Sequence, residues 1–432
     1  MDNNFIKPTK LRLLDLGSTP VRVFHITWLT FFLCFFGWFG IAPLMPVVRQ
    51  ELGLTKAEIG YIIIASVSIT VFARLLFGWM CDKIGPRRSY SILLLVGSLP
   101  VMLIGFSDSF TSFLLFRLAI GMIGASFVIT QYHTSSMFAP NVVGTANAVA
   151  AGWGNMGGGA TLIIMPLIFA GFGALGFSDS ESWRLSMIVP GAILFAMAFV
   201  YYFFTVDAPA TERTKVTDSS ETVATTSPWA DYRVWMLFIA YGACFGIEIT
   251  IDNIAALYFV DNFQLDLKQA GLIAGLFGMM NIFARALGGV YGDKAGKKFG
   301  LRGRIIALGT FLALEGAGII VFSAMTSLVW AIAGMLAFAL FLKMSNGATY
   351  AVVPFINKKA VGTVSGIVGA GGNVGAVFAG MLFTSEHLSY RESFIVIGCV
   401  VIGVSVVTSL LSLSATALSR KNADAVTSEA LV

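Results

Sequence analysis

Charged residues are scarce in this 432-residue chain, and that scarcity limits the class of protein before any motif is considered. Only 12% of the residues are charged, whereas 57% are hydrophobic and the mean hydropathy is +0.83. The chain has more apolar surface than one soluble core can bury. Its apolar residues are also not distributed as they would be in a chain of several soluble domains. The composition therefore predicts a protein that lies in a lipid bilayer.

The motifs of ATP-driven and catalytic proteins are also missing. The chain has no loop of the Gly-x-x-x-x-Gly-Lys type, no cluster of metal ligands and no nucleophile beside a base. These absences argue against catalysis, a bound metal and any cofactor. The four cysteines are isolated in or beside apolar runs and favour small core residues over a disulfide: Cys34, Cys81, Cys244 and Cys399. Residues 1–20 are polar, so no removed signal peptide is expected.

Long apolar runs are abundant, and twelve of them are long enough to cross a bilayer as helices. An all-α membrane protein with both termini on one side follows from this number. The predicted spans are 23–46, 58–80, 90–107, 110–138, 143–171, 184–206, 233–260, 268–291, 305–324, 327–355, 361–385 and 391–415.

The distribution of Lys and Arg indicates which side the termini occupy. If the termini are cytoplasmic, nineteen of these residues lie in inner segments and five in outer ones. Cytoplasmic loops are enriched in Lys and Arg, so we expect an inner-membrane protein with cytoplasmic termini. Short basic loops against the membrane also explain the basic composition, and no nucleic-acid partner is expected. No obligatory protein partner is evident.

The chain is a duplication. Residues 72–85 and 283–296 are identical at eight of fourteen positions, and both segments end an apolar run with Asp-Lys. A second pair, 143–157 and 361–375, shares Val-Gly-Thr followed by Gly-Asn-x-Gly. Between the halves, residues 207–228 are rich in Thr, Ser, Ala, Pro and charge, which is typical of a linker. We therefore expect six-helix bundles at 1–206 and 229–432, joined by a cytoplasmic linker at 207–228.

Each half carries one arginine deep in the membrane. Arg74 and Arg285 precede the aspartates Asp82 and Asp293 by eight residues, or about 12 Å in a hydrocarbon core of about 30 Å. Each such arginine costs about 2.5–3.5 kcal/mol to insert, so a compensating negative charge is expected. A buried salt bridge is one possibility, but no acidic residue lies near either arginine on its own helix. The alternative is a bound oxyanion, whose planar shape a guanidinium matches with two hydrogen bonds.

Two glycine-rich helical segments, 150–159 and 369–375, refine this prediction. Glycine spacing alone indicates close helix packing. It does not account for Asn155 and Asn373 at the same place in both halves. An amide side chain beside exposed backbone can donate a hydrogen bond to an oxyanion that an arginine has already oriented.

These features together resemble a known family. The two parallel halves and the Asp-Lys-x-Gly turns are similar to the major facilitator superfamily, which implies alternating access about a central site. Segments 150–159 and 369–375 look like the paired nitrate signatures of the nitrate/nitrite porter family. Segments 127–132, 245–253 and 347–350 support that resemblance, and the segment from 142 onward is especially similar to plant-type high-affinity members.

The resemblance implies a site for nitrate, and nitrite as well. Its expected residues are Arg74, Arg285, Asn155, Asn373, Gly154, Gly372, Phe127, Tyr241 and Phe245. For Phe127 an ordinary packing role is the alternative. A conformational latch at the turns is implied by Asp82, Arg87, Arg88 and Asp293, although a basic loop that only orients the chain would look the same.

Uptake of nitrate needs an energy source, because an interior-negative membrane opposes an entering anion by about 2.3 kcal/mol per 100 mV. Protons entering with nitrate or nitrite leaving in exchange would each supply it. Tyr241, Phe245, Glu248 and Asp252 follow helical spacing and share one face of the seventh span. Glu248, with Asp252, is therefore the candidate proton-coupling carboxyl of a nitrate/proton symporter. A structural hydrogen bond, or a pairing of Glu248 with a cation of another helix, is the alternative.

Several alternatives stay open on sequence alone. Lys343 could pair with Glu315 or with Glu248, and the second pairing weakens the proton argument. Arg117 and His133 fit structural polar roles better than functional ones. A nitrate sensor that keeps the transporter fold and a transporter of another small organic anion are the competing functions.

Overall fold

A computed structural model describes residues 7–10, 12–139, 142–208, 227–356, 361–385 and 387–429. Of residues 82, 143–144, 354, 361–363 and 411–429 it describes only the backbone. All regular structure in these residues is helical. Among the described residues, eleven helical stretches are long and apolar enough to cross a membrane, and the longest, Leu267–Ser323, covers two of the predicted spans. Each of the twelve predicted spans thus has a helical counterpart, and the all-α prediction is confirmed.

Capping residues fix where several helices begin and end. Thr55 and Glu58 form a reciprocal capping box before α3 (Lys56–Ile84), and Ser178 and Glu181 form another before α8 (Asp179–Phe204). Each pair satisfies backbone N–H groups that the first helical turn leaves without partners. Gly53 ends α2 (Met45–Leu52) with a φ of 61°, which glycine adopts at little cost.

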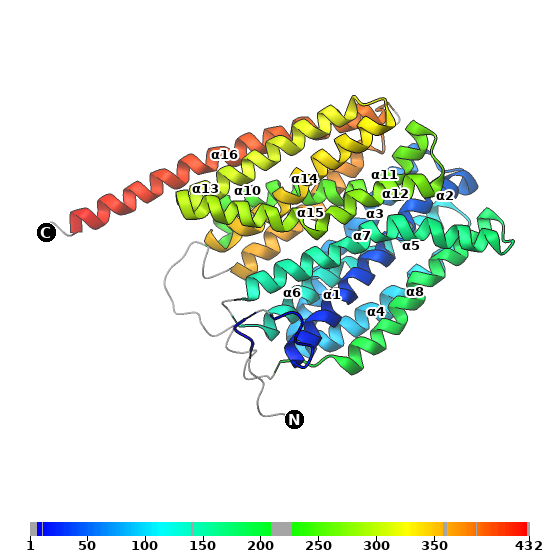
Figure 1. Ribbon diagram of the computed structural model, residues 1–432, viewed down its shortest axis with the longest axis horizontal. Helices are drawn as coiled ribbons and strands as arrows, with labels where there is room; N and C mark the ends of the chain where they lie inside the picture. Colours follow the sequence, from blue (N-terminus) through cyan, green and yellow to red (C-terminus); the bar gives the residue numbers. More distant parts are fainter. Residues whose placement is uncertain are drawn as a thin grey trace. The chain divides into compact units, whose positions relative to one another are not determined.

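The contacts between residues divide the chain into two units. Unit 1 comprises Met1–Val223, Thr250–Ile282 and Gly380–His387. Within it α4 packs along α8 and α1 along α7, as Figure 1 also shows. Its helices, besides α2, α3 and α8, are α1 (Thr19–Trp38), α4 (Pro86–Leu103), α5 (Phe110–Ile120), α6 (Ser126–Met137), α7 (Val143–Ala174), most of α11 (Ile247–Phe263) and α12 (Leu267–Met279).

One ion pair and one close helix contact join the Thr250–Ile282 segment to the rest of unit 1. The Arg49 guanidinium of α2 donates to both carboxylate oxygens of Asp261 in α11, at 2.8 and 2.6 Å. The α7 and α12 backbones meet at Gly159 and Gly278, where a Cβ on either glycine would overlap the other chain segment. Small residues permit this approach, as the glycine-rich sequence of α7 predicts.

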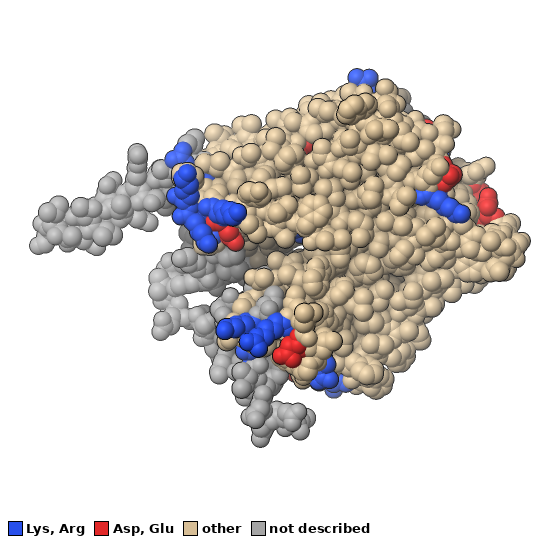
Figure 2. All heavy atoms as spheres, in the orientation of Figure 1, with Lys and Arg blue, Asp and Glu red and all other residues tan. Residues whose placement is uncertain are grey.

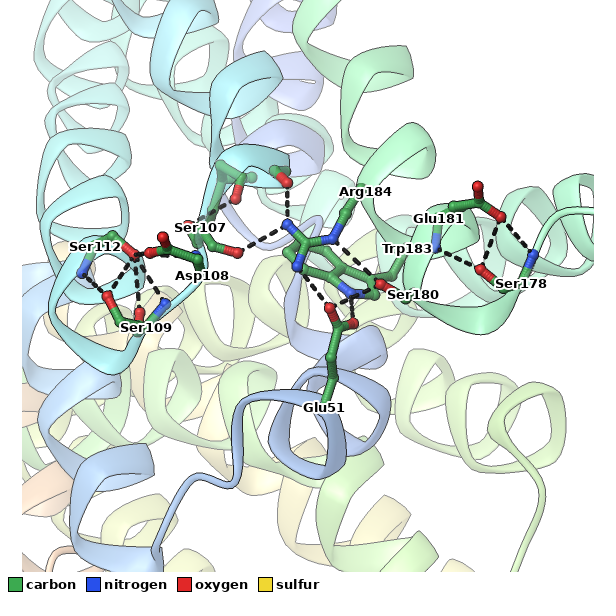
Figure 3. Close-up of polar contacts among 12 residues, drawn as sticks. Glu51, Ser107, Asp108, Ser109, Ser112, Ser178, Ser180, Glu181, Trp183 and Arg184 are labelled. Carbon is green, nitrogen blue, oxygen red and sulfur yellow. Dashed lines mark hydrogen bonds and ion pairs between the residues drawn. The ribbon is translucent and has the colours of Figure 1, made fainter.

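A further network of unit 1 surrounds Arg184 near the start of α8 (Figure 3). Its guanidinium pairs with Glu51 of α2 at 2.5 Å and donates to the Ser107 carbonyl at 2.8 Å and to the Gly105 carbonyl. The Trp183 indole donates to the other Glu51 oxygen. One side chain therefore joins α2, α8 and the connection between α4 and α5.

Unit 2 comprises Ala224–Ile249, Phe283–Ala379 and Leu388–Val432. Its helices are α10 (Tyr232–Tyr241), α13 (Ala284–Ser323), α14 (Leu328–Val352), most of α15 (Val361–Leu382) and α16 (Tyr390–Glu429). A π-helical turn at Gly242–Gly246 separates α10 from α11. Within α13 the backbone leaves helical geometry at Phe299 and Gly300, and there the two predicted spans that share α13 are divided.

The surface agrees with burial in lipid. On the face that Figure 2 shows, charged side chains are sparse and broad stretches carry none. Large apolar side chains are instead exposed, including Phe72, Leu75 and Trp79 of α3. Lipid is the solvent such a surface requires, because in water it would be a liability for aggregation. Most of the predicted linker at 207–228 lies outside the described residues.

Candidate functional site

In unit 1, α3 presents Arg74 to an aromatic ring of α6. The guanidinium carbon of Arg74 lies 5.3 Å from the centre of the Phe127 ring, and its Nε donates to the Gly124 carbonyl at 3.3 Å. A cation over a ring face is held by the ring quadrupole, so Phe127 orients Arg74 without neutralising its charge. Arg74 is half-buried.

Next to this pair, α7 presents Gly154 and Asn155. Phe31 of α1 packs directly on Gly154, where a Cβ would overlap the Phe31 ring. The Phe31 ring centre lies 5.9 Å from that of Phe127. Asn155 is only 2% exposed, and among the described residues neither its amide nitrogen nor its amide oxygen has a hydrogen-bond partner.

Unit 2 contains the counterpart arginine, Arg285. Its Nη2 donates to the Tyr241 hydroxyl at 2.9 Å, and its guanidinium carbon lies 5.6 Å from the centre of the Phe245 ring. The Tyr241 and Phe245 rings are stacked, with centres 5.0 Å apart and planes 12° from parallel. Within the described part of the chain, Arg285 Nη1 makes no hydrogen bond although it is buried. The Nη1 donor of the Arg285 guanidinium is therefore the group that a ligand could use.

The glycine and asparagine of α15 repeat the arrangement seen in α7. A Cβ on Gly372 would overlap Phe245 and press on Tyr241, so both rings need a glycine there. Asn373 is fully buried, and no described residue bonds its amide nitrogen or oxygen. A buried polar group without a partner costs about 1–3 kcal/mol, so its presence in both units calls for an explanation.

Each unit thus holds an arginine beside a phenylalanine ring, a glycine packed under an aromatic ring, and a buried asparagine whose amide no described residue bonds. Amide N–H groups and guanidinium N–H groups are donors, and aromatic faces accept a flat ion with delocalised charge. Each set therefore presents groups of the chemical type that a small planar oxyanion requires. We call the set in unit 1 (Arg74, Phe127, Phe31, Gly154, Asn155) and the set in unit 2 (Arg285, Phe245, Tyr241, Gly372, Asn373) the two half-sites.

Two aromatic residues of this region were not predicted. Phe31 occupies in unit 1 the place on the signature glycine that Phe245 occupies in unit 2. Tyr350 of α14 meets the Tyr241 ring edge-on, with centres 5.1 Å apart. The first span is rich in phenylalanine, and no repeat or spacing in the sequence distinguishes Phe31 from its neighbours.

The structure answers the question of what Lys343 pairs with. Its Nζ lies 2.6 Å from Glu248 Oε1, and Asn346 of the same helix donates to Glu248 Oε2 at 2.5 Å. Glu248 is therefore an ion-pair partner, which was the alternative that weakens a proton-carrying role for this carboxyl. The other candidate, Asp252, belongs to unit 1, where its carboxylate lies near Gly158 of α7. The π-helical turn at Gly242–Gly246 interrupts the regular helix that the shared-face prediction assumed.

Of the predicted latch residues, Arg87 and Arg88 lie in the first turn of α4, whereas Asp293 lies within α13 before the break at Phe299 and Gly300. Arg87 donates from its backbone N–H to Asp207 at 2.9 Å and from Nε to the Tyr202 carbonyl at 2.5 Å, while Arg88 is exposed. In unit 2, Asp293 pairs with Arg304, which also donates to the Ala351 carbonyl at 3.2 Å. The Asp82 side chain lies outside the described residues.

Arg117 and His133 have structural partners, as the sequence favoured. Arg117 is buried and donates to the Trp38 carbonyl at 3.0 Å and to the Asn253 side chain at 2.9 Å. His133 bonds the Tyr201 hydroxyl at 2.6 Å and the Val206 carbonyl at 3.0 Å. The part of the chain that the structure describes holds no group of three His, Cys, Asp or Glu side chains placed to bind a metal ion.

Comparison with known proteins gives a consistent result. Residues 27–379 match the Major Facilitator Superfamily. The chain is 40% identical over 393 residues to the high affinity nitrate transporter 2.5 of Arabidopsis thaliana, covering 90% of this chain and 78% of the relative. It is 37% identical over 400 residues to nitrate transporter 2.1 of Chlamydomonas reinhardtii, covering 89% and 73%. With the nitrate/nitrite transporter NrtP of Picosynechococcus sp. it shares 28% over 451 residues, covering 82% and 83%.

Solved structures support the fold. A bacterial homolog of the human lysosomal transporter Spinster superimposes with a TM-score of 0.73 at 16% identity, over 91% of this chain and 97% of that one. The xylose transporter XylE from E. coli gives 0.68 at 13% identity, over 90% and 97%. At such identities the likeness concerns the fold alone.

Proposed function

Because this chain belongs to the major facilitator superfamily and, within it, to the nitrate/nitrite porter family, we propose that it carries nitrate, and nitrite as well, across the cytoplasmic membrane. The observation that carries the proposal is the pair of buried, unsatisfied asparagines, Asn155 and Asn373, each in a half-site with an arginine. Nitrate is the substrate whose oxygens would satisfy these donors.

The chemistry of the half-sites fits that ion. Nitrate is planar and carries one delocalised charge, so a guanidinium fork can bind two of its oxygens in plane. The flat faces of Phe127 and Phe245 would limit the ion to orientations parallel to a ring. Nitrite presents the same planar N–O geometry with one oxygen fewer, and the same donors would bind it with fewer hydrogen bonds.

Transport would follow from alternating access between the two halves of the sequence, 1–206 and 229–432, with both termini in the cytoplasm. The repeat relating residues 72–85 to 283–296 supports this division. Asp293 with Arg304, and Asp82 with Arg87 and Arg88, would act as a latch at the cytoplasmic turns. The pairing of Asp293 with Arg304 supports the latch in the second half.

For the energy source we favour nitrate/proton symport. The supporting observation is the burial of a second carboxyl, Glu315, beside the Glu248–Lys343 pair in the unit that contains Arg285. Ionisable groups within a membrane protein commonly mark ion and proton pathways. Nitrate/nitrite exchange is the alternative, since it moves no net charge. A nitrate sensor would keep the half-sites but would not transport.

Purified protein in liposomes tests this function. Uptake of labelled nitrate should be accelerated by an acidic exterior without any internal nitrite. A strict requirement for internal nitrite would show that the protein exchanges nitrate for nitrite. Nitrate binding without transport, under any pH gradient or membrane potential, would indicate a nitrate sensor. Glu248→Gln should weaken the response to the pH gradient, whereas Glu392→Gln, at an exposed position in the first turn of α16, should leave it unchanged. If Glu248→Gln leaves proton-driven uptake unchanged, Glu248 has no role in coupling protons to nitrate.

A further inference from the structure

Four charged side chains are buried in the membrane-spanning helices of unit 2 that the structure describes. Arg285 is 8% exposed, Glu248 is 1% exposed, and Lys343 and Glu315 are fully buried. They come from three helices, with Arg285 and Glu315 on α13, Lys343 on α14 and Glu248 on α11. Burying four charges is expensive in a membrane, so their grouping indicates a function.

Three of the four charged side chains, Glu248, Lys343 and Arg285, interact with one another. Glu248 is bound through one oxygen to Lys343 and through the other to Asn346, so its ionised form is fully engaged. Arg285, which belongs to the half-site, also interacts electrostatically with Glu248. Glu248 therefore pairs directly with the buried lysine and acts electrostatically on Arg285.

Glu315 differs from Glu248 in its surroundings. Among the described residues neither of its carboxylate oxygens accepts a hydrogen bond. The Ser345 hydroxyl lies beside Glu315 but donates to the Phe341 carbonyl at 2.9 Å, so it can offer the carboxyl no more than a shared hydrogen bond. An ionised carboxylate buried without hydrogen bonds is strongly disfavoured, whereas a protonated one is tolerated.

The charged and titratable groups around Glu315 are few. Lys343 of α14 and Glu248 of α11 interact with it electrostatically, and so does the thiol of Cys244 in the π-helical turn. On the side of α16 the contact is through Gly316 and Gly398, and the described side chains of α16 have charge only at Arg391 and Glu392 in the first turn. Lys343 and Glu248 are thus the charged side chains that determine the electrostatic potential at the Glu315 carboxyl.

The charge balance of this group depends on Glu315. When Glu315 is ionised, two carboxylates offset Arg285 and Lys343, and an arriving anion meets no net positive charge. When Glu315 is protonated, one positive charge is left for the anion to balance. Anion binding at Arg285 and proton binding at Glu315 therefore favour each other, and such a coupling is reciprocal.

We propose that Glu315 is the proton-binding site of this transporter, and that Glu248 and Lys343 link it to the anion held at Arg285. The proposal rests on the proposed nitrate transport and adds the site of proton binding. Glu248 is then a positioning residue that stays ionised. One proton taken up with each nitrate makes the loaded transporter electrically neutral with respect to its empty form.

Nitrate titration calorimetry on the purified protein tests the proposal, with buffers of different ionisation enthalpy reporting the protons taken up. The wild type should take up close to one proton per nitrate at alkaline pH, and the Kd for nitrate should rise about tenfold per pH unit there. Glu315→Gln, which mimics the protonated acid, should bind nitrate with no proton uptake and no such pH dependence. Glu392→Gln should behave as the wild type.

Two results would overturn the assignment. One is wild-type nitrate binding without proton uptake, and the other is undiminished uptake in Glu315→Gln. If Glu315→Gln does not fold, infrared difference spectra of the wild type provide the test, because nitrate should produce the carbonyl band of a protonated carboxylic acid. That band should shift in Glu315→Asp, and its absence or insensitivity would refute the assignment. If the wild type binds no nitrate at any pH, the result would instead contradict the proposed nitrate transport itself.

Discussion

At the scale of single residues, the proposed nitrate site depends most on two buried asparagines, Asn155 and Asn373. A protein gains nothing in stability from a buried amide that lacks partners, and an apolar residue at the same place would avoid the cost. The sequence singled out both residues through their repetition and through the resemblance to the paired signatures. The sequence could not reveal that Phe31 covers Gly154, nor whether Lys343 pairs with Glu248 or Glu315, because both depend on which helices are neighbours.

Replacing Asn155 or Asn373 by alanine should separate binding from stability. Nitrate affinity should fall about tenfold for each variant, because a charge-assisted hydrogen bond of about 1.5 kcal/mol is lost. The melting temperature without nitrate should not fall, since no bond within the protein is broken. Calorimetry and thermal unfolding measure the two quantities. Asn346→Ala is the matched control and should be destabilised, because it removes the donor to Glu248. A loss of stability in Asn155→Ala equal to that in Asn346→Ala would show that the amide has an internal partner.

Asp231, at the start of α10, gives a prediction for pH. Burial raises the pKa of this carboxyl, but hydrogen bonds and the charge of Arg233 outweigh it, and the pKa lies below its ordinary value. A carboxyl with a depressed pKa contributes stability above its ordinary pKa, and that contribution is lost as the pH falls through the folded-state value. The wild type should therefore lose thermal stability below about pH 4 more steeply than Asp231→Asn. Parallel stability curves for the two proteins would contradict this.

At the scale of helices, the sequence predicted most of what the structure contains. Apolar runs located all twelve spans, and capping residues such as Thr55 and Ser178 mark helix starts within a few residues of the predicted limits. The π-helical turn at Gly242–Gly246 was not predicted, because a run of small residues is equally compatible with a regular helix. The turn lies where the backbone of α15 comes close, since a Cβ on Gly246 would overlap it.

The glycines of α7 differ in what they contact, and this difference can be tested. A Cβ on Gly157 would overlap the Phe32 carbonyl of α1, whereas a Cβ on Gly173, on the same helix, would meet nothing within 4 Å. Gly157→Ala should lower thermal stability by separating α1 from α7. Gly173→Ala should leave it unchanged or raise it by up to about 1 kcal/mol, since alanine favours helix. Thermal inactivation of the two variants compares them directly, and equal effects would contradict the packing of α1 on α7.

At the scale of the whole molecule, duplication explains why two half-sites of similar composition exist. Each arises from the same local rule, in which a glycine on one helix admits a ring and the next residue presents an amide. The sequence repeat predicted the two halves, but not that contacts would group Thr250–Ile282 and Gly380–His387 with unit 1. A repeat records common ancestry of segments, whereas contacts depend on how the folded segments pack.

The central claim is that Arg74 and Arg285 bind the anion through their planar forks, and nitrate binding to Arg74→Lys and Arg285→Lys tests it most directly. Lysine keeps the charge and loses the fork, so each variant should lose more than about a hundredfold in affinity by calorimetry. Arg391→Lys, at an exposed position in the first turn of α16, should bind as the wild type does. Near-normal nitrate affinity in either Arg74→Lys or Arg285→Lys would contradict the account.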